Sequence, residues 1–346
     1  MSTTLNMGVI GLGIVSGGHL EKYKEYDRAN LYAICDNDPE WLPDAEKLYK
    51  PEKAFLDYHE MLADPKLDAV SICLPTALHA QTTIAALNAG KHVLCEKPMA
   101  LNAKEADEMK AAADKTGKKL MISHNQRLEG NVLYMKQLQE EGYFGDIYLM
   151  RIGWRRPMGI LPPVFETRPN GKRYNRNFFN EKDNGGGVLR DLGSHLLDLS
   201  LHITNFPTPV ATVSSLYRKF YNPENDLSKY PCDSEDMAVA QITFDDGLTM
   251  QLEFSFASHV AEDTGLTELY GTKAGASRRG TTLKLIEYDE KNTIIKPIHY
   301  PIATKFTQEC FVDAVLDNTD VPITAEEGCK VIEVLDEIYK AAGDTK

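Results

Sequence analysis

Three side chains in this sequence are of types that move or stabilise protons near neutral pH. Lys97 lies in a Glu-Lys-Pro tripeptide directly after an apolar run, and Asp191 and His195 follow the three glycines at 185–187. Residues four apart on a helix share a face, so we expect Asp191 and His195 to point the same way. An imidazole, with a pKa of about 6.5, can take a proton from a hydroxyl group. A lysine ammonium can stabilise the oxygen anion that results.

Each of these residues also has a structural interpretation. A lysine in a loop is most often a solvated surface charge. An Asp and a His near the start of a helix commonly cap the helix or bind neighbouring backbone groups. Residue type alone therefore does not decide between a chemical and a structural role, and the surrounding pattern has to be considered.

A glycine-rich turn near the start of the chain fits a dinucleotide site. Gly11 and Gly13 follow an apolar run, and Ser16 stands where the G-x-G-x-x-G/A pattern has its third small residue. Such glycines permit a tight turn and let the backbone approach a pyrophosphate. Glycine turns after strands are common, so the turn alone is a weak signal. Asp36 ends the next apolar run about 20 residues on, where an acid that binds the ribose is expected.

The residues around Asp36 favour NAD over NADP as the cofactor. A carboxylate accepts hydrogen bonds from both ribose hydroxyls but repels a 2′-phosphate. Residues 37–40 add acidic groups and contain no Arg or Lys. For His79 a purely structural role is as plausible as a cofactor contact. The expected cofactor-binding residues are Gly11, Gly13, Ile14, Val15, Asp36, Asn37, Leu74, Pro75, Thr76, His79, Glu96, Lys97 and Asn125.

The first third of the chain alternates β-rich runs with helical segments. This alternation predicts an α/β domain over 1–123, a doubly wound parallel sheet of the Rossmann type. Open α/β sheets bind ligands at the carboxyl ends of their strands. The glycine turn, Thr76 and Lys97 all fall at predicted strand ends, so the sequence predicts that they lie at one edge of the sheet.

After Ser123 the pattern changes. A polar stretch at 157–184 has a length typical of a functional loop or a disordered segment. Strand-like runs with an Asp-Gly hairpin signal fill about 209–300. Two helices close the chain, the last one preceded by a Thr-x-x-Glu capping box. We therefore predict a second, α+β domain over 124–346 with a large, mainly antiparallel open sheet. Its terminal helices are also candidates to pack on the first domain.

Residues that lead into the second domain are candidates to bind substrate. Arginines there suit a carboxylate or phosphate, and Trp154 suits stacking on a sugar ring. The arginines are equally compatible with ion pairs in a loop or interface. Arg155 and Arg156 point to opposite sides if they lie in a strand, so at most one of them faces the site. The expected substrate-binding residues are Lys97, Arg127, Trp154, Arg155, Arg156, Asp191 and His195.

Three stretches together resemble the Gfo/Idh/MocA family, the relatives of glucose–fructose oxidoreductase and inositol dehydrogenase. They are GLGIVSGGH at 11–19, CLPTALHAQTTIAALNAGKHVLCEKPMA at 73–100 and GGGVLRDLGSHLLDL at 185–199. The resemblance implies a Rossmann domain followed by a domain whose open sheet forms an oligomer interface, a nicotinamide cofactor, and sugar- or polyol-like substrates. It also implies that Lys97, Asp191 and His195 are catalytic and that Glu96 helps to hold the nicotinamide.

The expected function is thus that of an NAD-dependent oxidoreductase acting on CH–OH groups. In this interpretation His195 takes the hydroxyl proton, Lys97 stabilises the oxygen, and Asp191 orients the substrate or the imidazole. Two alternatives use the same cofactor site: a glycoside hydrolase that recycles NAD within one turnover, and a non-catalytic dinucleotide or sugar sensor. The intact proton-transfer residues argue against the sensor.

Composition restricts the partners. The formal net charge is −13, and there is no run of five Lys or Arg, so neither nucleic acid nor an anionic membrane is an expected partner. Six cysteines without a C-x-x-C pair suit a reducing cytoplasm and predict no metal site. The N-terminal residues do not have the pattern of a signal peptide. We expect a cytoplasmic homodimer or homotetramer.

Overall fold

The computed structural model describes residues 4–157, 181–219, 233–289 and 291–343. Most of the polar stretch at 157–184 therefore lies outside the described residues. The chain divides into two compact units. Among the described residues, the first unit contains 4–123 and 306–332. The second contains 124–157, 181–219, 233–289, 291–305 and 333–343.

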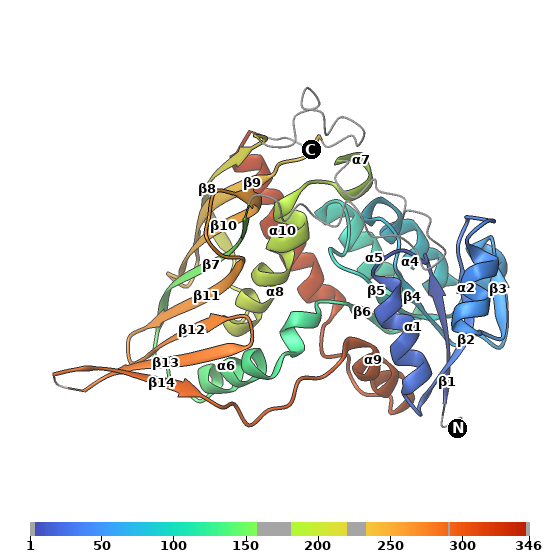
Figure 1. The fold of residues 1–346 in the computed structure, drawn as a ribbon, viewed down its shortest axis with the longest axis horizontal. Helices are drawn as coiled ribbons and strands as arrows, with labels where there is room; N and C mark the ends of the chain where they lie inside the picture. The colour runs from blue at the N-terminus through green and yellow to red at the C-terminus, as the bar shows by residue number, and fades with distance from the viewer. Residues whose placement is uncertain (1–3, 158–180, 220–232, 290, 344–346) are drawn as a thin grey trace. The chain divides into compact units, whose positions relative to one another are not determined.

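The first unit is built on a six-stranded parallel sheet with the order β3-β2-β1-β4-β5-β6 (Figure 1). Its strands are β1 Leu5–Ile10, β2 Ala29–Cys35, β3 Lys53–Phe55, β4 Ala69–Ile72, β5 His92–Cys95 and β6 Leu120–Ile122. β1 pairs with both β2 and β4, which makes it the point where the strand order reverses and where dinucleotides bind in this fold. The predicted Rossmann sheet is confirmed, although the short β3 is not evident from the sequence pattern.

Helices of the first unit connect the strands and cover the sheet. They are α1 Ser16–Glu25, α2 Leu42–Tyr49, α3 Tyr58–Leu62, α4 His79–Asn88, α5 Ala103–Thr116 and α9 Thr307–Leu316. The side chain of Asn102 caps α5 by accepting from the amide of Glu105 at 3.0 Å, and Gly117 ends it in the left-handed region. α9 packs beside α1, and Arg28 pairs with Asp317 of the turn that follows α9.

The second unit is built on an eight-stranded sheet with the order β14-β13-β12-β11-β7-β10-β9-β8 (Figure 1). Its strands are β7 Ile147–Pro157, β8 Pro209–Tyr217, β9 Met237–Phe244, β10 Thr249–Ser258, β11 Thr264–Gly271, β12 Gly275–Arg279, β13 Thr282–Tyr288 and β14 Thr293–Ile298. Neighbouring strands are antiparallel except for β7 and β10, which are parallel. Gly247 turns the β9–β10 hairpin with a φ of +89°. The predicted, mainly antiparallel open sheet is confirmed.

One face of this second sheet is covered by helices and the other is open. On the covered face lie buried side chains such as Met150, Ile152 and Leu252. The covering helices are α6 Gly130–Glu140, α8 Ser194–Ile203 and the second half of α10 Ala325–Ala341. On the open face Val213 is 75% exposed and Tyr288 is 76% exposed. An antiparallel sheet with one solvated face normally carries polar residues there, so these apolar side chains are notable.

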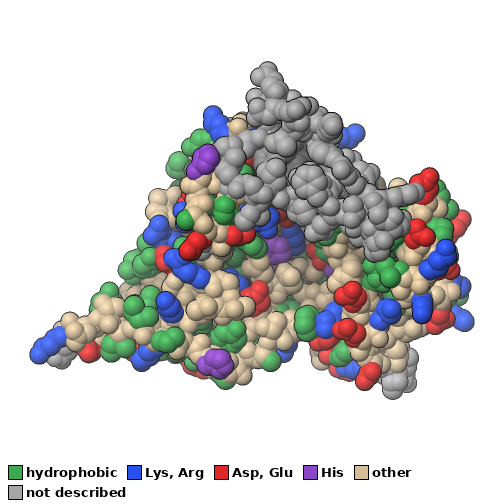
Figure 2. All heavy atoms as spheres, in the orientation of Figure 1, with side chains coloured by type: hydrophobic (Ala, Val, Ile, Leu, Met, Phe, Trp, Pro, Cys, Tyr) green, Lys and Arg blue, Asp and Glu red, His purple; other side chains and the backbone are tan. Residues whose placement is uncertain are grey.

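Further features bear on the sequence predictions. The capping box before α10 is confirmed, because Thr324 Oγ1 accepts the amide of Glu327 at 3.2 Å and Glu327 Oε2 accepts the amide of Thr324 at 2.9 Å. Acidic and basic side chains of the described residues are mixed over the face drawn in Figure 2. None of the helices in the described part of the chain is long and apolar enough to cross a membrane.

Candidate active site

The turn after β1 has a geometry that requires its glycines. Gly11 has a φ of +88°, and a Cβ there would lie 2.6 Å from the carbonyl oxygen of Cys73. Gly13 differs, because nothing lies within 4 Å of the position its Cβ would take. Next to this open backbone, Ile14 is 43% exposed and Val15 is 47% exposed. The turn therefore presents bare backbone and apolar side chains to a ligand.

The turn leads directly into α1, which is suited to a phosphate. Ser16 starts the helix, and its hydroxyl donates to the carbonyl of Gly13 at 2.7 Å. The first turn of α1 carries no acidic side chain, and Val15 at the N-cap makes no side-chain cap in the described structure. Backbone N–H groups at a helix start bind anions, and the helix dipole adds to the attraction. This end of α1 thus fits the pyrophosphate of a dinucleotide.

Asp36 ties the glycine turn to the end of β2. Its Oδ2 accepts the amide of Leu12 at 2.8 Å, and its Oδ1 accepts the amide of Asp38 at 2.9 Å. A carboxylate has about four acceptor positions, so two remain for ribose hydroxyls. Asn37 is exposed beside it. The sequence predicts a ribose contact for Asp36, but the bond of Asp36 to Leu12 emerges only from the structure.

The loop after β4 is held by His79. Leu74 and Pro75 precede a short 3-10 turn at Thr76–Leu78, and His79 starts α4. The imidazole is buried, with Nδ1 2.9 Å from the carbonyl oxygen of Pro98 and Nε2 2.8 Å from that of Leu74. Burial lowers the pKa of His79, which favours the neutral ring. Both ring nitrogens thus face backbone carbonyls of this unit, which supports the structural alternative for His79.

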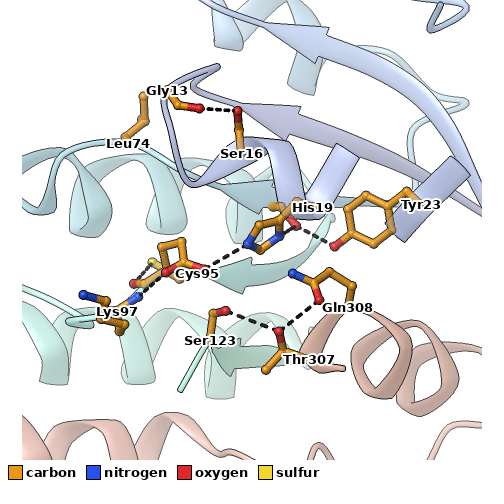
Figure 3. Close-up of polar contacts among 12 residues, drawn as sticks. Gly13, Ser16, His19, Tyr23, Leu74, Cys95, Lys97, Ser123, Thr307 and Gln308 are labelled. Carbon is orange, nitrogen blue, oxygen red and sulfur yellow. Dashed lines mark hydrogen bonds and ion pairs between the residues drawn. The ribbon is translucent and has the colours of Figure 1, made fainter. Parts of the chain in front are cut away.

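Lys97 follows β5 in a tightly held segment. The Lys97–Pro98 peptide bond is cis, Pro98 is buried, and Lys97 is half-buried. The amide of Lys97 donates to Oε2 of Glu96 at 3.2 Å, and Oε1 of Glu96 lies 2.9 Å from Nε2 of His19 (Figure 3). Burial opposes ionisation of Glu96, but the hydrogen bond and charge of His19 outweigh it and hold the pKa of Glu96 below its usual value. Both carboxylate oxygens of Glu96 therefore bind groups of the protein itself.

Asp191 and His195 lie where the structure departs from the sequence prediction. Leu189–Gly193 forms a π turn and α8 begins only at Ser194, so Asp191 and His195 do not lie on one regular α-helix. A π turn accommodates an extra residue, so the four-residue spacing no longer implies a shared α-helical face. Between 185 and 201, however, Asp191 and His195 are the two residues that are half-exposed, and all the others are buried. Exposure of these two side chains from a buried segment is typical of a site.

A carboxylate that is distant in sequence holds the backbone at the start of this π turn. Glu235, just before β9, accepts the amides of Gly187 at 2.8 Å and Leu189 at 3.0 Å and the hydroxyl of Tyr339 at 2.7 Å. A Cβ on Gly187 would lie 2.0 Å from the backbone oxygen of Glu235, which explains the glycine. Sequence reasoning missed Glu235 and Tyr339, because neither lies in a local motif with Asp191.

Arg127 needs a correction. It is 1% exposed, and its guanidinium binds the buried carboxylate of Asp198, with Nε 3.0 Å from Oδ2 and a second bond from Nη2 to Oδ1. The guanidinium also lies over the ring of Phe206. This burial does not fit the expected contact with substrate. Asn125, in the same short 3-10 segment, is exposed.

The strand residues Trp154, Arg155 and Arg156 separate as their alternation predicts. Trp154 and Arg156 lie on the helix-covered face, with the Arg156 guanidinium 5.3 Å from the Trp154 ring and Trp154 Nε1 donating to Asp263 at 2.6 Å. Arg155 lies on the open face, 3.7 Å from a carboxylate oxygen of Glu253. Arg155 is therefore corrected to a sheet-surface residue. Trp154 and Arg156 share the face that the π turn contacts.

Family models match both units. A model described as oxidoreductase family, NAD-binding Rossmann fold, matches residues 5–124, and a model for the GFO/IDH/MocA C-terminal domain matches residues 132–277. Myo-inositol 2-dehydrogenase of Thermotoga maritima is 34% identical over 199 residues, a match that covers 58% of this chain and 54% of that protein. D-glucoside 3-dehydrogenase of Escherichia coli is 27% identical over 351 residues, covering 99% and 96%.

Solved structures share the fold over nearly the whole chain. Levoglucosan dehydrogenase in complex with NADH and levoglucosan has a TM-score of 0.86 and 23% identity, covering 99% of this chain and 98% of that one. At this level of identity the likeness shows the fold alone.

Proposed function

The chain belongs to the Gfo/Idh/MocA family of oxidoreductases, and from this premise we propose that it transfers hydride between NAD and a hydroxyl or ketone carbon of a sugar- or polyol-like molecule. One observation carries the proposal. The glycine turn, Asp36 and Lys97 follow β1, β2 and β5 of one parallel sheet, at the edge where such sheets bind ligands. The relatives named for inositol and glucoside oxidation support this substrate class.

The chain's own residues fit a bound dinucleotide. The open backbone at Gly13 and the start of α1 would hold the pyrophosphate, and Asp36 would hold the ribose. Asp36 is followed by Asp38 and Glu40. These negative charges oppose a 2′-phosphate, so we propose NAD rather than NADP. When bound, the nicotinamide ring supplies the hydride acceptor or donor.

We assign the proton chemistry to three residues. An imidazole nitrogen of His195 takes the proton of the substrate hydroxyl, and Nζ of Lys97 donates to the same oxygen and stabilises its negative charge. Asp191 accepts a hydrogen bond from a substrate hydroxyl or from the imidazole. The half-exposed positions of all three side chains support these roles. Among the described residues no group of three His, Cys, Asp or Glu side chains suits a metal ion.

The test is a substrate panel with both cofactors. Purified protein is mixed with NAD or NADP and inositols, methyl glucosides, anhydro sugars and aldoses, and reduced nicotinamide is followed by its absorbance. We expect NADH with one substrate class, and a loss of about 10²-fold or more in kcat for His195→Ala and Lys97→Ala with NADH binding retained. Release of the leaving group from an aryl glycoside without net NADH would instead identify the NAD-recycling hydrolase. NADH binding without turnover of any kind would favour the sensor.

We also propose that the open sheet face joins copies of the chain in a homodimer or homotetramer. The exposed side chains of Val213, Tyr288 and Ile295 lie on that face, and apolar groups there gain by burial. Light scattering coupled to gel filtration should give at least a dimer, and Val213→Glu should shift it toward monomer. A monomeric wild-type protein would end this proposal.

A cytoplasmic location is proposed as well. The five cysteines within the described residues are free thiols, which suits a reducing compartment. Fractionation of the source cells with an antibody tests it.

A further inference from the structure

Beneath the glycine turn runs a chain of buried polar side chains that ends at Lys97 (Figure 3). His19 projects from α1 and is 2% exposed. Its Nε2 lies 2.9 Å from Oε1 of Glu96, and its Nδ1 lies 3.1 Å from Oγ of Ser71, which is 2.6 Å from the hydroxyl of Tyr23. The helix that begins at the end of the glycine turn thus also contributes the partner of Glu96.

Hydrogen bonds at both ring nitrogens orient the His19 imidazole. Burial raises the pKa of Tyr23 far above its usual value, so Tyr23 keeps its proton and donates to Ser71. Oγ of Ser71 pairs with Nδ1 of His19, and Nε2–H of His19 donates to the carboxylate of Glu96, because a carboxylate only accepts. The network therefore holds the His19 ring with its Nε2–H aimed at Glu96.

The Glu96 carboxylate joins His19 to the backbone of Lys97. Its second oxygen accepts the amide of Lys97 at 3.2 Å, and the hydroxyl of Ser123 adds a further stabilising hydrogen bond. On the other side of the segment, His79 binds the carbonyl of Pro98. The backbone of Lys97 is thus held by one side chain from α1, through Glu96, and by one from α4.

We propose that His19 is a positioning residue for Lys97 and acts through Glu96. The helix α1, which follows the glycine turn, then determines the position of the lysine. The inference rests on the proposed function only in assigning catalysis to Lys97. In this inference Glu96 connects His19 to the backbone of Lys97. A displacement of about 1 Å at a reacting group can lower a rate about 10²-fold, so this support matters for catalysis even where the fold survives its loss.

Two amide substitutions separate the bonds of His19. Gln places an N–H near the position of Nε2 and can still reach Glu96, whereas Asn extends only to the position of Nδ1 and reaches Ser71. Tyr23→Phe is the matched control, because it removes a hydrogen bond at the far end of the same buried chain. Thermal unfolding of all three variants shows whether they lose comparable stability.

Kinetics with the substrate found in the panel give the first readout. We expect kcat of His19→Asn to fall about 10–100-fold with the Kd for NADH unchanged, while His19→Gln and Tyr23→Phe stay close to wild type. If His19→Asn and Tyr23→Phe behave alike in kcat, His19 is only a part of the fold and the proposal is wrong.

A second readout needs no substrate. Trace acetylation of Lys97 by acetic anhydride, quantified by peptide mass spectrometry from pH 7 to 11, reports the environment of its amine. We expect the Lys97 curve of His19→Asn to shift from that of wild type, and the curve of Tyr23→Phe to overlay it. Coinciding curves for all variants would overturn the positioning role. A shifted curve in a protein without any turnover would instead count against the proposed function and leave the positioning of Lys97 supported.

Discussion

Replacing Arg127 by Met tests whether this arginine serves the fold or the substrate. Both Arg127 and Asp198 are almost completely buried, and two hydrogen bonds join them. Removing one partner of a buried ion pair leaves an uncompensated charge and costs about 3–5 kcal/mol. We therefore expect Arg127→Met to lower the free energy of unfolding by about that amount. The double variant Arg127→Met/Asp198→Leu replaces the pair by apolar groups and should recover most of the loss.

The assay is urea unfolding followed by circular dichroism, with NADH binding measured on the same samples. A substrate-binding arginine would behave differently, because its loss would raise KM and leave unfolding unchanged. A cost below about 1 kcal/mol for Arg127→Met, or a double variant no more stable than the single one, would refute the structural assignment. Asp198→Asn serves as a second probe of the same pair.

Three further predictions concern the first unit. Gly11→Ala should weaken NADH binding at least tenfold and lower the free energy of unfolding by about 1–3 kcal/mol, because Gly11 has a φ of +88° and its Cβ would meet the carbonyl oxygen of Cys73. Gly13→Ala is the control, because a Cβ at Gly13 has open space. Unchanged stability of Gly11→Ala would contradict this geometry. Asp36→Ala should lower the preference for NAD over NADP and should also loosen the glycine turn, because the hydrogen bond to the amide of Leu12 is lost. An unchanged ratio of the Kd for NAD to the Kd for NADP would show that Asp36 does not bind the ribose. Burial and the nearby Lys118 and Lys119 lower the pKa of His92 from 6.5 to about 4. Between pH 6.5 and 4 the unfolded chain therefore binds a proton at His92 that the folded chain does not bind. The free energy of unfolding should fall as the pH drops through this range. His92→Asn should remove roughly 2 kcal/mol of this loss of stability. The side-chain oxygen of the Asn can still accept the amide of Lys119, so that hydrogen bond is kept. Parallel profiles of unfolding free energy against pH for wild type and variant would refute the lowered pKa of His92.

Local signals predict this structure well where the determinants are local. Gly11 and Asp36 carry their roles in residue type and spacing, and the Asp-Gly turn at Gly247 needs only its own dipeptide. β3 and β12 escape prediction because their residues, KAF and GASRR, form no apolar run and no apolar–polar alternation. β14 escapes as well, since its residues are mostly exposed.

The candidate site divides in the same way. The importance of Lys97, Asp191 and His195 could be inferred from motifs, but their supports could not. The π turn at Asp191 depends on Glu235, and the segment of Lys97 depends on His19, and each support comes from a part of the chain far from the residue it holds. The substrate contact expected for Arg127 was misplaced for a related reason. Its partner Asp198 is 71 residues away, so the sequence does not show that the guanidinium charge is already paired with a carboxylate.

The strand pairing in the second sheet has a consequence for how the protein is made. β7 ends at residue 157, yet its two neighbours are β10 and β11, which are synthesised roughly a hundred residues later. The first unit likewise takes α9, at 307–316, from near the end of the chain. Pairings so distant in sequence close large loops and form slowly. We therefore expect both units to complete their cores only after the C-terminal segment is made. On the ribosome β7 then stays unpaired while about a third of the chain is synthesised, and the nascent chain depends on chaperones more than a chain of local hairpins would.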